Sequence, residues 1–421
     1  MIARVTAVLC LSGFLLFIAC SKRSTDEVSA KGDHQVNQRV VNKASYIAKG
    51  KASRFAVDEF RLKDSATLRT VFFVDEINGW VAGGGKLYKT GDGGKSWEQI
   101  EIKVPQGADV EFIQFLNETV GWIVIQKRAP DVLKYQEAHF WLMQTNDAGQ
   151  SWHLQYEDRD AEVTGFSISD QHDGWLAGIK YVGPARYTFL IVHTSDRGQH
   201  WMDVYADLKN TTSKTKNEVP DGIDGPIKTR PETNDGVMGL IPTGPLTATI
   251  ITGTMQILRT SDGGRKWARI VTVTDKFDQQ SVIRRLGTKG GYLWMVEATD
   301  SEEGTRGKLT IEQANSSWTR YILQGVYLAD VVSLSGREFV SCGYVKRSED
   351  RGEKINTFLE GAILHSADDG EHWTILYRNP QIKRINSLIA LDSDHVWAVG
   401  DDGLILRLWS SAKESKNMTA N

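Results

Sequence analysis

The residues Thr90-Gly91-Asp92-Gly93-Gly94-Lys95-Ser96-Trp97 have the skeleton Ser/Thr-x-Asp-x-Gly-x-x-Trp, which occurs five times in this chain of 421 residues. The aspartates of the five copies are Asp92, Asp147, Asp196, Asp262 and Asp368, and the closing tryptophans are Trp97, Trp152, Trp201, Trp267 and Trp373. A degenerate sixth copy ends at Trp318, with Gln313 and Asn315 in place of Asp and Gly. Successive tryptophans are then 55, 49, 66, 51 and 55 residues apart. A period of this length predicts a repeat architecture.

Each copy has the chemistry of a tight β-hairpin turn. The aspartate can accept hydrogen bonds from backbone N–H groups of the turn, and the glycine tolerates a positive φ. The tryptophan opens the next strand and can pack its ring against the hairpin. None of these roles needs a substrate, so we interpret the aspartates and tryptophans as structural. The stretch resembles the Asp-box, or bacterial neuraminidase repeat, and this implies a β-propeller in which each Asp-box joins the third strand of a blade to the fourth.

The segments between the Asp-boxes predict an all-β fold. Each unit begins with an apolar strand, and a second strand often opens with Gly-Trp, as at Gly79-Trp80. The last unit ends near Trp409 without an Asp-box, and Phe55–Leu62 alternates well enough to supply its missing strand. Residues 55–410 number 356, about 51 for each of seven units. We therefore predict a seven-bladed β-propeller of four-stranded antiparallel blades over residues 54–410, closed by the N-terminal strand. Six and eight blades stay open.

The N-terminus predicts export and a lipid anchor. Val5–Ile18 is a nearly unbroken apolar run, too short to span a bilayer comfortably. Phe17-Ile18-Ala19-Cys20 resembles a lipobox, which implies a signal peptide over residues 1–19 and lipidation of Cys20. We expect a location in the cell envelope, on the periplasmic side of the inner or the outer membrane. Secretion with cleavage elsewhere is the alternative. The polar composition of residues 20–53 predicts a flexible tether, and residues 411–421 are expected to be a C-terminal tail.

Long insertions are expected on one face of the propeller. In a four-stranded blade, the turns between strands two and three, and the links between blades, lie opposite the Asp-boxes. This arrangement predicts a binding face, with tolerated surface variation as the alternative. The insertions are Lys127–Glu137, Tyr181–Tyr187, Asp207–Asp235, Asp300–Arg306 and Lys346–Asn356. Because Tyr and Arg are enriched in binding hot spots, the candidate partner-binding residues are Lys127, Arg128, Tyr135, Tyr181, Arg186, Tyr187, Lys346 and Arg347.

Other chemistries find little support in the sequence. The net charge is -3 and the insertions carry no basic stripe, so nucleic-acid binding is not expected. A sialidase needs three arginines that grip a carboxylate and a tyrosine nucleophile with a glutamate partner, and we cannot assign this set. The pair His193 and His200 lacks a third ligand for zinc. We predict no catalytic residue, no metal site and no cofactor.

Three phrases of the sequence carry a closer resemblance. The first is a motif made of Gly79–Gly84, Leu87–Thr90 and the first Asp-box. Gln256–Gly264 matches the second half of this motif, and Val396–Leu406 matches its first half. Residues 65–410 thereby resemble the photosystem II stability/assembly factor family. The resemblance implies an exported, non-enzymatic, seven-bladed propeller that binds assembly intermediates of membrane proteins.

These observations favour a non-enzymatic, membrane-anchored propeller that binds a protein partner, such as a membrane complex, on its loop face. The alternative is a glycan-binding propeller or a sialidase-like glycoside hydrolase. A cluster of three arginines with a Tyr/Glu pair in the central depression would favour that alternative. A third class is a structural envelope lipoprotein without a discrete ligand.

Overall fold

The computed structural model describes residues 40–48, 55–63, 66–168, 173–204, 235–272, 281–301, 303–314, 317–334, 337–350 and 355–410. Within these ranges the chain forms β-strands, turns and one short 3-10 helix, η1 (Val132–Glu137). The predicted signal peptide, Cys20, the C-terminal tail and nearly all of the Asp207–Asp235 linker lie outside the described residues. No helix in the described ranges is long and apolar enough to cross a membrane.

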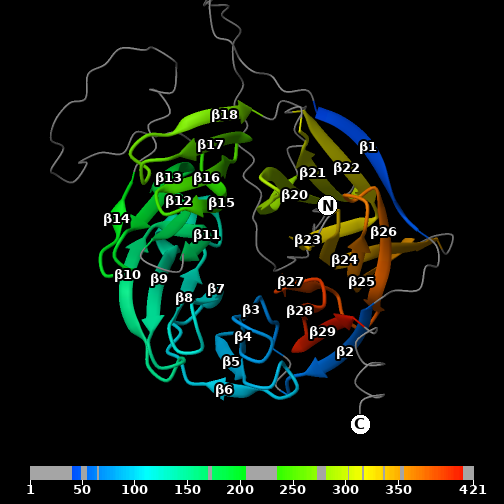
Figure 1. Ribbon diagram of the computed structural model, residues 1–421, viewed down its shortest axis with the longest axis horizontal. Coiled ribbons are helices and arrows are strands. Elements are labelled where there is room, and N and C mark those ends of the chain that lie inside the picture. Colours follow the sequence, from blue (N-terminus) through cyan, green and yellow to red (C-terminus); the bar gives the residue numbers. More distant parts are fainter. Residues whose placement is uncertain are drawn as a thin grey trace, which may run out of the picture.

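The strands form sheets arranged around a central axis (Figure 1). The four-stranded antiparallel sheets are β3–β6 (Thr70–Phe73, Gly79–Gly83, Lys86–Thr90, Glu98–Ile100), β7–β10 (Asp109–Phe115, Gly121–Lys127, His139–Thr145, His153–Arg159), β11–β14 (Ala161–Ile168, Gly174–Gly183, Arg186–Thr194, Met202–Asp203), β15–β18 (Val237–Gly244, Thr247–Thr252, Gln256–Thr260, Ala268–Thr272), and β27–β29 with β2 (Ile385–Ala390, His395–Gly400, Leu404–Ser410, Phe55–Arg61). The predicted all-β architecture of four-stranded antiparallel sheets is confirmed.

One larger sheet has nine strands. It contains β19–β22 (Val282–Lys289, Tyr292–Ser301, Gly304–Glu312, Trp318–Gln324), β23–β26 (Val326–Ser333, Phe339–Asp350, Ile355–Ser366, His372–Asn379) and β1 (Val40–Ile47). β1 lies between β22 and β26, the outer strands of two four-stranded groups. Main-chain pairing through β1 therefore joins these two groups into one sheet.

The hydrophobic core lies between neighbouring sheets. The second strand of a sheet is buried on both faces, as in β4 and β28, where every residue is buried. Burial on both faces explains why these strands read as apolar runs without alternation. The Trp80 ring stacks on Phe115 of the next sheet at 3.5 Å, and Trp397 stacks on Phe73 at 3.8 Å. The repeated Gly-Trp and Val-Trp strands thus supply the large rings that join one sheet to the next.

The predicted tether is wrong between Val40 and Ile47, where the chain forms β1. Residues from Val40 to Ser45 pair in parallel with β22, and Tyr46 and Ile47 pair in parallel with β26. Ser45 is the only buried residue of β1, and its hydroxyl donates to the Gly370 carbonyl at 2.5 Å. The polar composition misled the prediction because a strand added to exposed sheet edges is held by main-chain hydrogen bonds and does not require apolar side chains.

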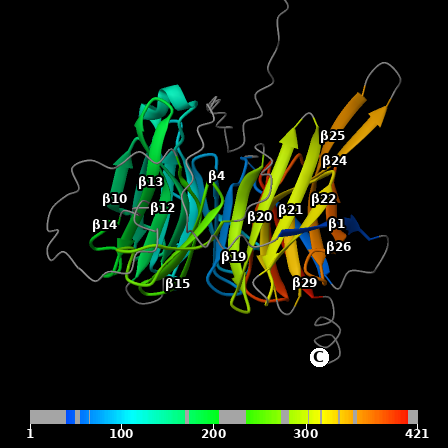
Figure 2. The same cartoon turned by 90° about the horizontal axis from the view of Figure 1, so that it is seen from above.

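The insertions and the repeated turns lie on opposite faces. The repeated turns follow the third strand of their sheets, whereas η1 and the hairpins β12–β13, β20–β21 and β24–β25 precede it. Figure 2 shows η1 and the end of the β24–β25 hairpin projecting on the same side of the molecule. We call this side the loop face. The described parts of the predicted insertions other than Asp207–Asp235 lie on it.

Candidate functional site

The five repeated turns share one hydrogen-bond pattern. Asp92 Oδ1 accepts from the Thr90 hydroxyl at 2.8 Å and from the backbone N–H groups of Lys95 and Ser96 at 2.9 Å. The Gly94 N–H donates to the Thr90 hydroxyl at 3.0 Å, with a Gly94 φ of 91°. The hydroxyl-to-aspartate bond recurs at 2.7–2.9 Å in the turns of Asp147, Asp196, Asp262 and Asp368.

The turn hydrogen bonds favour the ionised aspartate. Burial raises the pKa of Asp92, but the hydrogen bonds from Ser96, Thr90 and Lys95 together outweigh burial and lower that pKa to about 2. The pKa of Asp147 and that of Asp196 are also lowered to about 2. A carboxylate held in this way by its own turn is suited to a structural role and poorly suited to proton transfer. Of the closing tryptophans, Trp267 and Trp373 are buried, whereas Trp97, Trp152 and Trp201 are half-buried.

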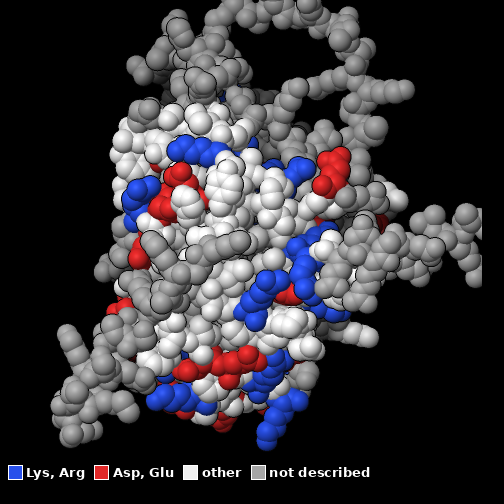
Figure 3. Space-filling view, turned by 90° about the vertical axis from the view of Figure 1, so that its right-hand side faces the viewer, with Lys and Arg blue, Asp and Glu red and all other residues white. Residues whose placement is uncertain are grey.

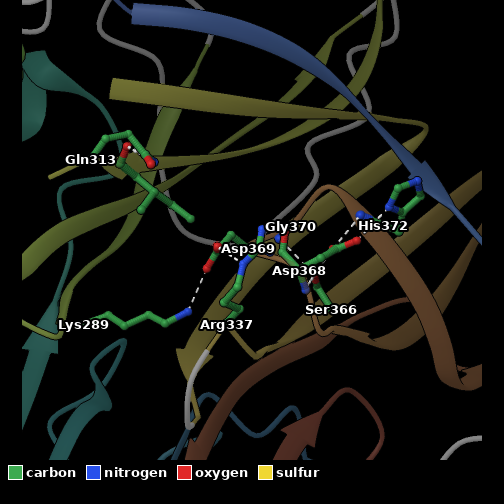
Figure 4. A network of polar contacts seen from close by, with 9 residues as sticks. Lys289, Gln313, Arg337, Ser366, Asp368, Asp369, Gly370 and His372 are labelled. Carbon is green, nitrogen blue, oxygen red and sulfur yellow. Dashed lines mark hydrogen bonds and ion pairs between the residues drawn. The ribbon is translucent and has the colours of Figure 1, made fainter. Parts of the chain in front are cut away.

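The fifth turn also links neighbouring strand groups (Figure 4). Asp368 accepts from the Ser366 hydroxyl and from the His372 N–H, each at 2.9 Å. Its neighbour Asp369 accepts from Lys289 Nζ at 2.8 Å and from Arg337 Nε at 2.6 Å. Lys289 ends β19, so this ion-pair group ties the group β19–β22 to the group β23–β26 on the turn face.

A central cavity of about 530 Å³ is lined by the first strands of the sheets, namely β3, β7, β11, β15, β19, β23 and β27. These strands begin on the loop face, because each follows a link between sheets. Charged residues near their beginnings therefore surround the loop-face end of the cavity, which we call the channel mouth. They include Arg69, Glu111, Arg284, Arg285 and Asp330.

Three arginines of the channel mouth have carboxylate partners. Arg69 Nε donates to Asp109 at 2.7 Å, and Arg285 Nη1 donates to both Asp330 oxygens at 2.9 Å. Arg128 lies 3.1 Å from a carboxylate oxygen of Glu111 and 3.5 Å from one of Glu162. Burial alone would lower the pKa of Arg128, but Glu111 and Glu162 reverse the shift and raise it. The charge of Arg128 is therefore well compensated.

Arg284 and Arg384 both lie near the Tyr327 ring, and Arg284 Nε also donates to the Ala329 carbonyl at 3.3 Å. Their guanidinium carbons lie 5.8 Å and 4.8 Å from the centroid of the Tyr327 ring, which fits cation–π contact. Burial lowers the pKa of Arg284, and the positive charges of Arg384 and Arg128 lower it further, against the opposing effect of Tyr327 and Asp330. Burial first, and then the neighbouring positive charges, disfavour the charged form of Arg284. A bound anion would relieve the repulsion.

The predicted loop residues fall into two groups. Arg128, Tyr135, Tyr181 and Tyr187 gather beside η1, where the Tyr135 and Tyr181 rings are 6.0 Å apart. Tyr181 is only 4% exposed and its hydroxyl donates to Glu162 at 3.1 Å. We therefore correct its assignment as a contact residue, because its ring packs against Ala129, Ala138 and Ile179 inside the loop face.

The remaining predicted residues are more exposed. Lys127 lies 3.2 Å from Glu137, and Arg186 is exposed at the start of β13. Lys346 and Arg347 lie far along the chain, on β24, where Lys346 Nζ donates to Asp300 at 2.9 Å and Arg347 lies over the Phe358 ring at 5.5 Å. The eight candidates therefore do not form one cluster.

The sequence analysis missed Arg284, Arg384 and Tyr327. It searched the insertions, whereas these residues lie at the beginnings of first strands or just before them. An alignment of the repeat units on their first strands could have pointed to this region. Charged residues recur early in these strands, as at Glu111, Arg284 and Asp330.

One outer side of the molecule carries charges of both signs. Figure 3 shows basic and acidic side chains intermixed on the side that carries β1. One group with metal-ligand chemistry occurs among the described residues, formed by Glu76, Asp392 and His395 with ligand atoms within 4.8 Å of one another. His395 Nδ1 lies 2.9 Å from Asp392, and Nε2 lies 3.6 Å from Glu76. The contacts of the imidazole with the two carboxylates account for this group without an ion.

A sialidase-like arrangement is only partly present. Tyr181 and Glu162 form a Tyr/Glu pair beside Arg128, but burial and the Glu162 charge raise the pKa of Tyr181 well above its ordinary value. The phenolate that a tyrosine nucleophile requires is therefore disfavoured.

Comparisons with known proteins indicate the fold. No family model matches the sequence, and no curated protein matches it. A solved structure of YCF48 bound to D1 peptide aligns with a TM-score of 0.53 and 18% identity, covering 87% of this chain and 99% of that chain. YCF48 from Cyanidioschyzon merolae aligns with a TM-score of 0.49 and 16% identity, covering 84% of this chain and 98% of that chain. An ancestral GH74 enzyme aligns with a TM-score of 0.51 and 12% identity, covering 81% of this chain but only 44% of its own. The chain is thus similar in fold to YCF48 and is a β-propeller.

Proposed function

We propose that the protein is a non-enzymatic scaffold of the cell envelope whose channel mouth binds a carboxylate-bearing segment of a protein partner. The observation that carries this proposal is the convergence of Arg284 and Arg384 on the Tyr327 ring, with guanidinium carbons 5.8 Å and 4.8 Å from its centroid. A carboxylate at this point would accept charge-assisted hydrogen bonds from guanidinium groups in a partly buried environment, where such bonds are strong. The fold similarity to YCF48, which was solved with a bound peptide, supports a protein partner.

The proposed scaffold is a closed ring of seven blades. Its support is the seam where the ends of the propeller meet. β2 pairs antiparallel with β29 from Phe55↔Ser410 to Arg61↔Leu404. At the same seam Trp397 Nε1 donates to the Gly93 carbonyl at 3.1 Å, and its ring stacks on Phe73. Trp80 and Phe115 make the same stacking contact between β3–β6 and β7–β10. A seam built like an internal junction is what a closed ring requires.

The proposed anchor is a lipid on Cys20, which lies outside the described residues. Mass spectrometry of the mature protein, purified from its own membranes, tests it. We expect an N-terminal peptide that begins at Cys20 and carries acyl chains, and we expect Cys20→Ala to release the protein from the membrane fraction. An unmodified Cys20 in the mature chain would exclude the anchor.

The binding proposal is tested with native, detergent-solubilised protein. We expect a defined membrane complex to copurify with the wild type and to be lost from the double variant Arg284→Gln/Arg384→Gln. The matched control is Arg61→Gln, which removes an arginine paired with Glu59 on the outer strand β2. Equal recovery of the complex by the wild type and the double variant would contradict the proposed site.

The second candidate function is glycan binding or glycoside hydrolysis. Arg128, Tyr181 and Glu162 favour it, because they place an arginine beside a Tyr/Glu pair at the cavity. Incubation with a fluorogenic sialoside, together with a glycan array, tests it. Hydrolysis that Tyr181→Phe abolishes would establish an enzyme. We expect no hydrolysis, because the pKa of Tyr181 is strongly raised.

A further inference from the structure

A chain of side-chain contacts runs from the channel mouth to the loop-face hairpins of the nine-stranded sheet. Tyr327, over which Arg284 and Arg384 lie, stacks on Tyr344 with ring centroids 4.9 Å apart and planes 4° from parallel. The two tyrosines are direct cross-strand partners on β23 and β24. The ring that the two guanidinium groups approach is therefore also held by stacking on a second ring.

Asp300 holds the outer ring of this stack. Its Oδ2 accepts from the Tyr344 hydroxyl at 2.6 Å, and its Oδ1 accepts from Thr305 at 2.6 Å and from Lys346 at 2.9 Å. Burial raises the pKa of Asp300, but these three hydrogen bonds outweigh the effect of burial and lower the pKa. Asp300 is thus an ionised acceptor that joins the β20–β21 hairpin to the β24–β25 hairpin.

Tyr344 has little freedom to move. The residue is 5% exposed, and its hydroxyl is committed to Asp300. Tyr327 stacks in parallel on this fixed ring, so its own ring is held in place for cation–π contact with the two guanidinium groups.

We propose that Asp300 and Tyr344 are positioning residues for the carboxylate site of Arg284 and Arg384. This proposal rests on the proposed function and deepens it. Asp300 holds Tyr344, Tyr344 holds Tyr327, and Tyr327 sets the place of both guanidinium groups.

The test compares two probes on the full mature protein. The first is a penta-alanine peptide with an N-terminal neutral coumarin and a free carboxylate, and the second is the same peptide with a C-terminal amide. Fluorescence anisotropy gives the two dissociation constants for the wild type, Asp300→Asn, Tyr344→Phe and Tyr377→Phe. Tyr377→Phe is the matched control, because it also removes a tyrosine-to-carboxylate hydrogen bond, from Tyr377 to Glu59 at 2.7 Å, but on the outer strands β26 and β2. Thermal melting confirms that each variant is folded.

We expect the wild type to bind the acid more tightly than the amide. In Asp300→Asn and Tyr344→Phe we expect this preference to fall by about threefold to tenfold, with little change in amide affinity. A general loss of structure would weaken both peptides alike and leave their ratio unchanged. If the wild type prefers the acid and both variants keep the full preference, the positioning role is overturned while the proposed site stands. If the wild type itself shows no preference, the carboxylate site is overturned, and the positioning role falls with it.

Discussion

The aspartates of the repeated turns are stronger hydrogen-bond acceptors as carboxylates than as acids, and this gives the fold a pH dependence. The folded-state pKa of Asp92, of Asp147 and of Asp196 is about 2, against an ordinary value of 3.8. The unfolded chain therefore takes up protons first as the pH falls. The stability from these groups is fully present above the ordinary pKa and is lost as the pH falls toward 2.

We therefore expect the melting temperature to decrease steadily between about pH 5 and pH 2. Circular dichroism melts across this range measure it. In the triple variant Asp92→Asn/Asp147→Asn/Asp196→Asn the protein should be less stable at neutral pH, and its melting temperature should depend less on pH below the ordinary aspartate pKa. An unchanged acid slope in the triple variant would assign the acid sensitivity to other carboxylates.

Two glycines make opposite predictions. A Cβ at Gly178 would overlap the carbonyl oxygen of Glu162, where β12 approaches a bulge in β11, whereas a Cβ at Gly91 would have no atom within 4 Å. We expect Gly178→Ala to lower the free energy of unfolding by about 2–4 kcal/mol, because backbone must move to admit the methyl group. Gly91→Ala should change it by no more than about 0.5 kcal/mol. Urea denaturation followed by tryptophan fluorescence measures both, and equal effects would contradict this assignment of close approach.

At the scale of a single strand, β1 predicts which amide groups are protected from hydrogen exchange. It covers the edges of β22 and β26, whereas β10 is an outer strand of its sheet without a further partner among the described strands. Removal of residues 40–48 should leave β2 in place but expose the paired edges. We expect faster amide hydrogen exchange in residues 318–323 and 372–373, and unchanged exchange in β10, which serves as the internal control. Faster exchange throughout the molecule would indicate global destabilisation instead of a local strap.

The contrast between β1 and β2 explains which strands could be predicted from the sequence. Phe55–Leu62 alternates, and the strand predicted there is β2. Val40–Ile47 buries one residue and has no such pattern, because its position depends on the unpaired edges of strands almost 300 residues away. The turns were predictable because Asp92 and its equivalents are bound by residues within four positions of themselves.

The channel mouth could not be predicted from the sequence for the same reason, because it forms by contacts between residues that are far apart in the chain. Arg284 lies beside Arg384 and Tyr327 only because the first strands surround one axis. A pattern within one unit cannot show which of its residues meets a residue two units later. The described structure gathers Arg284 and Arg384 at the Tyr327 ring and leaves the predicted Tyr181 buried, so we place the proposed binding surface nearer the nine-stranded sheet than η1.

Asp330 offers the last prediction, because it joins three first strands around the cavity. It accepts from Arg285 on β19, from the Val331 N–H on its own strand β23, and from the Ser387 hydroxyl and the Leu388 N–H on β27 at 3.2 and 3.1 Å. In Asp330→Ala the Leu388 N–H and the Arg285 guanidinium lose this acceptor. We expect the free energy of unfolding to fall by about 2–4 kcal/mol, since unsatisfied buried donors are costly.

Asp330→Asn separates charge from shape at this position. The amide keeps one acceptor oxygen for the strands but loses the charge that pairs with Arg285, so its effect should lie between those of the wild type and the alanine variant. Glu118→Ala, an exposed acid in the β7–β8 turn, is the control and should be neutral within about 0.5 kcal/mol. If Asp330→Ala were also neutral in urea denaturation, the carboxylate would not be needed to hold the three first strands together, and stacked pairs such as Trp397 and Phe73 would have to join the sheets without it.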